Sequence, residues 1–203
     1  SRGLGDVYKR QFLYNTLDTI VWLAEAGQKE QVVSMVQTLS DFFRASLNSG
    51  KDIVSLEGEC RHITSYLQIQ QVRYQDILTY DVDIPEEIAN CKIPKITLQP
   101  LVENALYHGI KNKRGKGRIV VTGRREKDKC VIRVEDNGIG MTKERLNQVR
   151  GGLTTKIEDS NDFYGLYNVN ERIRLKFGEE YGLSIDSVLQ AVSYTHLRAH
   201  ETS

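Results

Sequence analysis

The sequence contains little cysteine, and the cysteines it has are widely spaced. Only three are present among 203 residues, at Cys60, Cys91 and Cys130. Their odd number and wide separation exclude a disulfide framework and the paired spacing of a zinc site. We therefore interpret all three as small structural residues of a protein from a reducing compartment.

The sequence also lacks an excess of charge of either sign and lacks long apolar runs. Lysine plus arginine number 28 against 27 acidic residues, so the formal net charge is +1. This balance gives no electrostatic reason to expect binding to nucleic acid or to a membrane surface. No stretch approaches the ~20 apolar residues that span a bilayer, and no apolar signal region follows the start. We expect a soluble chain that contacts neither nucleic acid nor membrane.

The first half of the sequence predicts consecutive helices. Apolar residues recur at helical spacing over residues 12–24, 31–47 and 56–75, with a break at Gly27 and with Ser55 as the N-cap of the last helix. Consecutive helices of this length are typical of a helical bundle or a dimerisation module.

The second half predicts a mixture of strands and helices. The expected strands cover residues 78–84, 118–124, 130–135 and 183–187, and the expected helices cover residues 97–109 and 166–177. A short helix is expected after Met141, followed by a polar, mobile loop over residues 151–162. This order of elements predicts an α+β sandwich in which helices cover one face of a sheet.

Polar side chains follow one side of the predicted helix over residues 97–109. Asn104, His108 and Lys111 lie on this strip, whereas Glu103 projects from another side. The amide oxygen of Asn104 can ligate Mg²⁺, and basic groups nearby would neutralise phosphate charge. Taken alone, the pattern is more typical of an amphipathic helix with a solvated flank.

Two further segments combine glycine with positions at the ends of predicted elements. The run from Asp136 to Gly140 reads DNGIG and follows a strand. Its glycines permit close backbone approach to a ligand, and the Asp136 carboxylate can accept a hydrogen bond from an adenine amino group. Gly165 and Leu166 open a helix whose N–H groups can face phosphate. Taken alone, the first segment fits an ordinary turn equally well, and a turn is the commoner reason for the second.

Together, the three segments resemble a known set of motifs. Their order, the hairpin between the first and second, and the polar loop before the third resemble the Asn, Gly-rich 1 and Gly-rich 2 boxes of one ATPase fold. This fold is shared by histidine kinases, gyrase, Hsp90-type chaperones and mismatch-repair ATPases. The agreement of motif, order and context favours membership of this fold over coincidence.

The helical half resembles one group within this fold. The runs FLYNTL at 12–17, SYLQIQ at 65–70 with Arg73 and Tyr74, and PKITLQPLVENA at 94–105 are similar to those of LytS/YehU-type sensor histidine kinases. The resemblance covers residues 12–187. It implies an N-terminal helical dimerisation and phosphotransfer module followed by an α/β-sandwich ATP-binding domain of the GHKL (Bergerat) type.

The same resemblance implies an activity, cofactors and partners. A homodimer formed through the N-terminal helices would bind ATP and Mg²⁺ and phosphorylate a histidine on the first helix. The phosphoryl group would then pass to an aspartate in the receiver domain of a response regulator. The native protein would be a bacterial inner- or plasma-membrane protein, and this chain would belong to its cytoplasmic portion.

The resemblance also assigns roles to residues of this sequence. Asn104 would hold Mg²⁺, and Asp136 would bind the adenine amino group. Glu103 would be the catalytic residue, either as the base or as a residue that positions water. The residues expected to line the nucleotide or its phosphates are Gly138, Gly140, Gly165, Leu166, His108 and Lys111.

The sequence departs from the family pattern at several places. The phosphoacceptor histidine should stand directly before the FLYN run, where this chain has Gln11. Residues 1–11 show no apolar periodicity that would extend the first helix backwards, and no family-type final strand follows Ser187, so one edge of the sheet should be incomplete. His62 is expected to be a solvated residue and no substitute acceptor. Phe163 and Tyr164 precede Gly165 where the family more often has another glycine, which would narrow the phosphate loop.

These departures define the expected boundaries and the alternatives. We interpret residues 1–11 and 189–203 as non-native tails, residues 12–76 as the helical region, and residues 77–188 as the ATPase domain. Without the acceptor histidine, the chain should not autophosphorylate. Three alternatives remain open: a non-catalytic dimeric nucleotide-binding or interaction module of the same fold, a serine-directed kinase or ATPase of this fold, and an α+β domain without a ligand.

Overall fold

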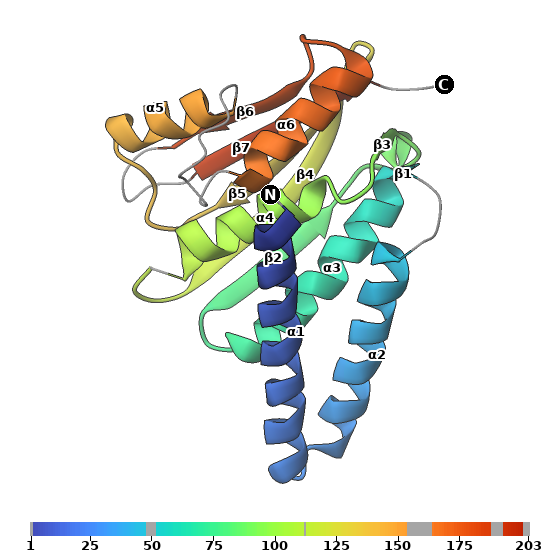
Figure 1. Ribbon diagram of the computed structural model, residues 1–203, viewed down its shortest axis with the longest axis vertical. Coiled ribbons are helices and arrows are strands. Elements are labelled where there is room, and N and C mark those ends of the chain that lie inside the picture. The colour runs from blue at the N-terminus through green and yellow to red at the C-terminus, as the bar shows by residue number, and fades with distance from the viewer. Residues whose placement is uncertain (1, 48–51, 112, 154–163, 188–192, 201–203) are drawn as a thin grey trace.

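The N-terminal part of the chain is a helical hairpin that extends away from the rest of the molecule (Figure 1). The computed structural model describes residues 2–47, 52–111, 113–153, 164–187 and 193–200. Helix α1 (Arg2–Glu25) turns at Gly27, whose φ of 73° lies in the left-handed region, into α2 (Lys29–Ser46). The prediction that the first helix begins at Phe12 is therefore wrong. A helix that is already nucleated can continue through residues that carry no apolar stripe.

Helix α3 (Leu56–Arg73) packs along α2, and Ser55 caps it as expected. The Ser55 hydroxyl accepts a hydrogen bond from the Gly58 N–H at 3.1 Å. The shared core includes aromatic rings from α1, α2 and α3, because Phe12 lies 5.2 Å from the ring of Phe42 and 5.2 Å from that of Tyr66. The three predicted helices therefore form one packed unit.

His62 lies inside this unit, so the prediction of a solvated side chain is wrong. It is 3% exposed, its ring stacks on Phe42 at 4.6 Å, and its Nε2 lies 2.9 Å from the Ser46 hydroxyl. Burial lowers the pKa of His62 to about 4. The residue is therefore neutral at pH 7. The polar neighbours of His62 in sequence made its face of α3 look solvent-exposed, but α2 covers that face.

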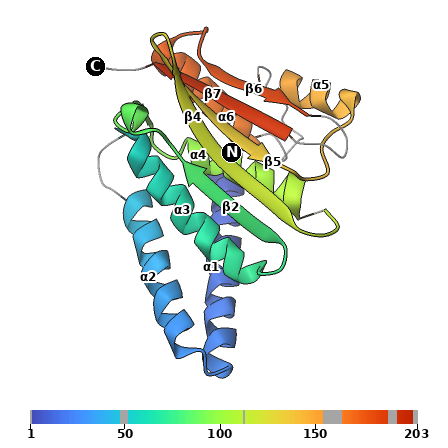
Figure 2. The ribbon, with the colours of Figure 1, turned by 180° about the vertical axis from the view of Figure 1, so that it is seen from behind.

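The second half of the chain forms one mixed sheet (Figures 1 and 2). The strands, in spatial order, are β2 (Leu78–Asp83), β4 (Gly117–Glu126), β5 (Lys129–Asp136), β7 (Ser193–His200) and β6 (Gly182–Asp186). Strands β2 and β4 run parallel, and all other neighbouring pairs are antiparallel. The short strands β1 (Ile53–Ser55) and β3 (Lys92–Pro94) pair separately, and neither was predicted because each has only 3 residues.

The sheet is complete where the sequence predicted a missing strand. Strand β7 lies between β5 and β6, and it pairs in antiparallel register with both. Ladder hydrogen bonds involve backbone groups, which any residue except proline can supply. The buried side chains of Leu197 and Ala199 complete the core. The expectation of an incomplete edge is therefore wrong, while the domain boundary at residue 188 stays a prediction.

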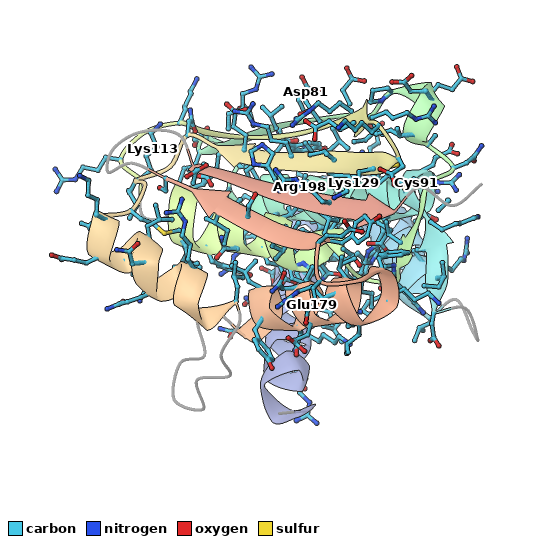
Figure 3. The ribbon with its side chains drawn as sticks, turned by 90° about the horizontal axis from the view of Figure 1, so that it is seen from above. Asp81, Cys91, Lys113, Lys129, Glu179 and Arg198 are labelled. Carbon is cyan, nitrogen blue, oxygen red and sulfur yellow. The ribbon has the colours of Figure 1, made fainter. Side chains whose placement is uncertain are left out.

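Helices cover one face of the sheet, as predicted for the α+β sandwich (Figure 3). They are α4 (Leu98–Asn104), which continues into the π-helical segment η2 (Ala105–Ile110), α5 (Lys143–Gly152) and α6 (Tyr164–Phe177). A short 3-10 helix, η1 (Glu86–Ile88), follows β2. The core between the layers is built from buried residues such as Ile119, Ile132, Leu101, Val169 and Ile173.

The opposite face of the sheet is polar. Arg118 and Asp81 form an ion pair at 3.1 Å between β4 and β2, and Arg133 and Glu135 form one at 3.4 Å along β5. Strands that alternate apolar and charged residues place their charged side chains on this face. Among the helices that the structure describes, none is both long and apolar enough to cross a membrane.

Candidate nucleotide-binding site

The helix formed by α4 and η2 carries the first group of predicted site residues. Asn104 stands at the junction between the α-helical and π-helical parts, and its side chain is partly buried. His108 is also partly buried, whereas Lys111 is exposed, with its Nζ 5.5 Å from the centre of the Tyr107 ring. Widened π-helical turns occur frequently at functional sites because they redirect side chains within a helix.

Asp136 meets this helix at Gly109. The Asp136 side chain, at the end of β5, is 6% exposed, and its Oδ1 accepts a hydrogen bond from the Gly138 N–H at 2.9 Å. A Cβ placed on Gly109 would lie 2.4 Å from that oxygen, and one on Gly138 would lie 2.3 Å from the Gly109 backbone. The structure therefore brings Asp136, Gly138 and Gly109 together, and only glycine fits at the two glycine positions.

Gly109 is the site residue that sequence reasoning missed. It stands within a helix, where glycine is destabilising compared with alanine. That unfavourable choice was the available signal, because it indicates close approach by another group. The approaching group, Asp136, is 27 positions away in sequence, so its identity could not be predicted from local pattern.

The surroundings of Asp136 shift the pKa of its carboxylate. Burial raises the pKa of Asp136 to about 6, while the Gly138 N–H and the Lys113 ammonium oppose this rise. Lys113 donates from Nζ to the Asn137 carbonyl at 2.8 Å, and it lies at the end of the sheet away from Cys91 in Figure 3. A carboxylate offers about four acceptor sites, so the bond from the Gly138 N–H leaves Asp136 with capacity to accept from a ligand.

The loop after Asp136 is shaped by glycine and by side-chain bonds. Gly140 has a φ of 69°, in the left-handed region that favours glycine. The Asn137 side-chain oxygen accepts from the Arg118 N–H at 2.6 Å, which ties the loop to β4. Thr142 then caps α5 by accepting from the Arg145 N–H at 3.2 Å. The predicted Gly138 and Gly140 therefore lie in one ordered turn beside Asp136.

The third predicted segment begins α6 against the start of α4. A Cβ on Gly165 would lie 3.4 Å from the Cβ of Pro100, so the first turns of the two helices are in contact. Leu166 is 2% exposed and belongs to the core. Its side chain therefore offers no surface to a ligand. Phe163 and the side chain of Tyr164, expected to narrow the phosphate loop, lie outside the described residues, as do residues 154–162 of the predicted mobile loop.

Glu103 lies on a different side of α4 from Asp136, facing the helical unit. Its Oε1 accepts a hydrogen bond from Gln99 Nε2 at 2.8 Å. Burial raises the pKa of Glu103, while the Gln99 amide and the Lys9 ammonium of α1 oppose this rise. The carboxylate also interacts electrostatically with Tyr66 of α3. Glu103 therefore interacts with α1 and α3.

The donor set suits Mg²⁺ only if the ion is bound together with phosphate. Among the described residues, no group of three or more histidine, cysteine, aspartate or glutamate side chains could hold a metal by itself. Mg²⁺ commonly takes one or two protein ligands and fills the remaining positions with water and substrate phosphates. An amide oxygen at Asn104 fits that limited role.

Comparisons with known proteins identify the family that each half of the chain matches. Residues 8–78 match the histidine kinase family, and residues 94–196 match the family described as histidine kinase-, DNA gyrase B-, and HSP90-like ATPase. The second match includes Asn104, Asp136 and Gly165.

Curated relatives are sensor kinases, and this chain covers part of each. Sensor histidine kinase YesM of Bacillus subtilis is 40% identical over 177 residues, which are 87% of this chain and 29% of the relative. Sensor histidine kinase BtsS of Escherichia coli is 34% identical over 92% of this chain and 30% of the relative. Sensor protein LytS of Staphylococcus saprophyticus is 33% identical over 87% of this chain and 29% of the relative. The chain thus spans less than a third of these relatives.

Solved structures show the same fold. The catalytic domain of histidine kinase ThkA has a TM-score of 0.52 and 9% identity, and the match covers 74% of this chain and 95% of that one. Acinetobacter baumannii histidine kinase AdeS has a TM-score of 0.52 and 10% identity, with 95% of both chains covered. At such low identity the likeness establishes the fold alone.

Proposed function

Since the chain belongs to the histidine kinase-, DNA gyrase B- and HSP90-like ATPase family and to the LytS/YehU-type sensor histidine kinases within it, we propose that it is the ATP-binding core of a two-component sensor kinase. In the intact kinase this core would bind Mg·ATP and phosphorylate a histidine, from which the phosphoryl group would pass to an aspartate of a response regulator. It belongs to the cytoplasmic portion of a bacterial membrane protein.

The contact of Asp136 with Gly109 and Gly138 is the observation that carries this proposal. A buried carboxylate with remaining acceptor capacity, next to two positions without side chains, suits a flat ring with an exocyclic amino group. Asp136 would accept from the adenine amino group, and Gly109 and Gly138 would let the chain pack closely enough to hold that carboxylate in place.

Residues on α4 and α6 would serve the phosphate end of the nucleotide. Bound Mg·ATP supplies the phosphoryl group and a cation that neutralises its charge. Asn104 would ligate the cation, and His108 and Lys111 would contact the phosphates. The N–H groups at the start of α6, near Gly165, would face phosphate oxygens.

Glu103 would act at the acceptor end. Its carboxylate faces α1, whose N-terminal part lies beside α4 (Figure 1). A general base works best when its pKa is near the operating pH, and burial moves the pKa of Glu103 upward. In the family pattern the acceptor histidine would occupy position 11 on α1. Because position 11 is Gln11 here, this chain would bind ATP without autophosphorylation.

The second candidate function is a dimeric nucleotide-binding module that performs no transfer. Gln11 favours this candidate, since glutamine offers no imidazole nucleophile. A substitution at position 11 distinguishes the two candidate functions. Gln11→His should acquire acid-labile phosphate from γ-labelled ATP if the kinase machinery is intact, and it should remain unlabelled if the module is non-catalytic.

Thermal melting with and without Mg·ATP tests the nucleotide site itself. A ligand at about 100 times its dissociation constant stabilises the fold by about 2.7 kcal/mol, which raises the melting temperature measurably. We expect that rise in the unmutated chain and its loss in Asp136→Asn and Asn104→Asp. Asp128→Asn, on the exposed turn between β4 and β5, is the matched control. If the unmutated chain is folded and Mg·ATP does not change its melting temperature, the proposal is contradicted.

A further inference from the structure

The turn that leads into α4 has an uncommon backbone conformation. Ile96 has a φ of 57°, in the left-handed region that β-branched residues rarely adopt. Thr97, the N-cap, makes no side-chain capping bond, and its hydroxyl donates instead to the Pro94 carbonyl at 2.5 Å. The first N–H groups of α4 must therefore find acceptors in another part of the chain.

Glu59 of α3 provides those acceptors. Its side chain is 3% exposed. Its Oε1 accepts from the Ile96 N–H at 2.9 Å, and its Oε2 accepts from the N–H groups of Thr97 at 3.0 Å and Leu98 at 3.3 Å. A carboxylate at a helix N-terminus accepts hydrogen bonds from the unpaired N–H groups and interacts favourably with the positive end of the helix dipole. The helical unit thus caps the helix that carries Asn104.

Arg172 of α6 holds the same turn from its carbonyl side. One guanidinium nitrogen donates to the Lys95 carbonyl at 2.7 Å, and the other donates to the Ile96 carbonyl at 2.7 Å. The N–H of Ile96 is therefore bonded to α3 while its carbonyl is bonded to α6. This arrangement retains Ile96 in a conformation that the isolated turn would disfavour.

The turn lies where it can affect the phosphate end of the nucleotide site. Asn104 follows Leu98 by about 9 Å along the helix, at 1.5 Å per residue. Gly165, at the start of α6, approaches Pro100 in the first turn of α4. A shift of this turn would move Asn104 relative to α6, whereas Asp136 contacts the far end of the helix at Gly109.

We propose that Glu59 and Arg172 are positioning residues that set Asn104 against the start of α6 and thereby control the Mg²⁺-dependent part of ATP binding. Neither residue is assigned a contact with ATP. The inference rests on the proposed function, because it concerns how well the same site holds Mg·ATP. It goes further by giving α3, in the helical unit, a defined influence on that site.

The test compares ATP affinity with Mg²⁺ and in EDTA by titration calorimetry. For Glu59→Gln, we expect the ratio of the dissociation constant in EDTA to that with Mg²⁺ to fall about tenfold, since small displacements of positioned groups have effects of this order or larger. The constant in EDTA should change little because the adenine site is remote from the turn. Glu57→Gln, an exposed change on the same helix, is the matched control.

Two further variants separate positioning from folding. In Glu59→Gln combined with Ile96→Gly, the ratio should recover, because glycine adopts a φ of 57° without strain. Arg172→Gln alters a more exposed position, so it tests the same prediction if Glu59→Gln fails to fold. Its ratio should fall in the same direction by a smaller factor.

Each outcome distinguishes this inference from the proposed function. If the unmutated chain binds Mg·ATP and the variants show the same ratio of dissociation constants in EDTA and with Mg²⁺, the positioning role is overturned and the proposed function stands. Equal weakening in both conditions, with a lower melting temperature, would show a structural role only and would also overturn it. If the unmutated chain binds no ATP in either condition, both fail.

Discussion

Asp136 shows how surroundings change the chemistry of one residue. In water an aspartate ionises near pH 3.9, whereas burial raises the pKa of Asp136 to about 6. The ionised form is the stronger acceptor for an adenine amino group. We therefore expect the dissociation constant for adenosine to rise about tenfold between pH 7 and pH 5, as the carboxylate becomes protonated. Adenosine is the probe because it has no phosphate that titrates in this range, and Asp136→Asn should show no such pH dependence. Affinity that is constant over this range would contradict the assignment.

The same pKa predicts how Asp136 affects stability without nucleotide. Because its pKa is higher in the folded chain than in the unfolded one, its favourable contribution is complete below about pH 4 and is lost as the pH rises through about 6. Asp136→Asn stays neutral and can still accept from the Gly138 N–H. We expect it to raise the free energy of unfolding at pH 7 by about 1–3 kcal/mol, measured by urea denaturation. If Asp136→Asn lowered the free energy of unfolding at pH 7, burial would not be destabilising the ionised carboxylate.

At the scale of an element, the helix formed by α4 and η2 is shaped by what contacts it. It begins at a turn bonded to α3 and α6, changes to π-helical geometry at Ala105, and reaches Asp136 at Gly109. Its amphipathic pattern predicted the element but not these contacts. The helix therefore links the helical unit at one end to the proposed adenine site at the other.

Gly109→Ala tests the close approach at the far end of this helix. Alanine is the better helix former, so propensity alone predicts a gain of about 0.5–1 kcal/mol. The new Cβ would instead lie 2.4 Å from the Asp136 carboxylate, and one group must move. We expect a lower melting temperature and at least about tenfold weaker nucleotide binding.

Gly151→Ala on α5 is the matched control for that substitution. A Cβ there meets nothing within 4 Å, so the change should be neutral or slightly stabilising. If Gly109→Ala behaved like this control, the contact between Gly109 and Asp136 would not limit the site.

At the scale of the whole molecule, the helical hairpin presents apolar side chains to solvent. The large exposed ones on α1 and α2 include Tyr14, Leu17, Val21, Trp22, Val33 and Val36. Burying such a surface against a second copy is the expected role of the hairpin in the proposed homodimer.

Trp22→Glu should weaken that dimer. Trp22 is 61% exposed in the single chain, and a buried charge in its place would be costly. We expect at least about a tenfold increase in the dimer dissociation constant by analytical ultracentrifugation, equivalent to about 1.4 kcal/mol. Asp128→Asn, on the exposed turn between β4 and β5, should leave the dimer dissociation constant unchanged. A monomeric parent chain, or a variant with unchanged association, would argue against this surface.

The sequence by itself determined the elements and the order of the motifs. The helix over 31–47, the strands around residues 118–124 and 130–135, and the DNGIG turn all follow from periodicity and turn chemistry, which act between residues close in sequence. The α+β sandwich follows from the order of these elements. The family was indicated by the resemblance of the motifs, and of their order, to a known set.

Only the tertiary structure decided which distant groups meet. His62 is buried because α2 covers it, Gly109 is required because Asp136 approaches it, and Ile96 is held in the left-handed region by Glu59 and Arg172. Each outcome depends on residues from separate elements, and local patterns contain no information about such pairs. Backbone pairing likewise placed β7 in the sheet, because ladder hydrogen bonds require suitable strand geometry more than a particular sequence.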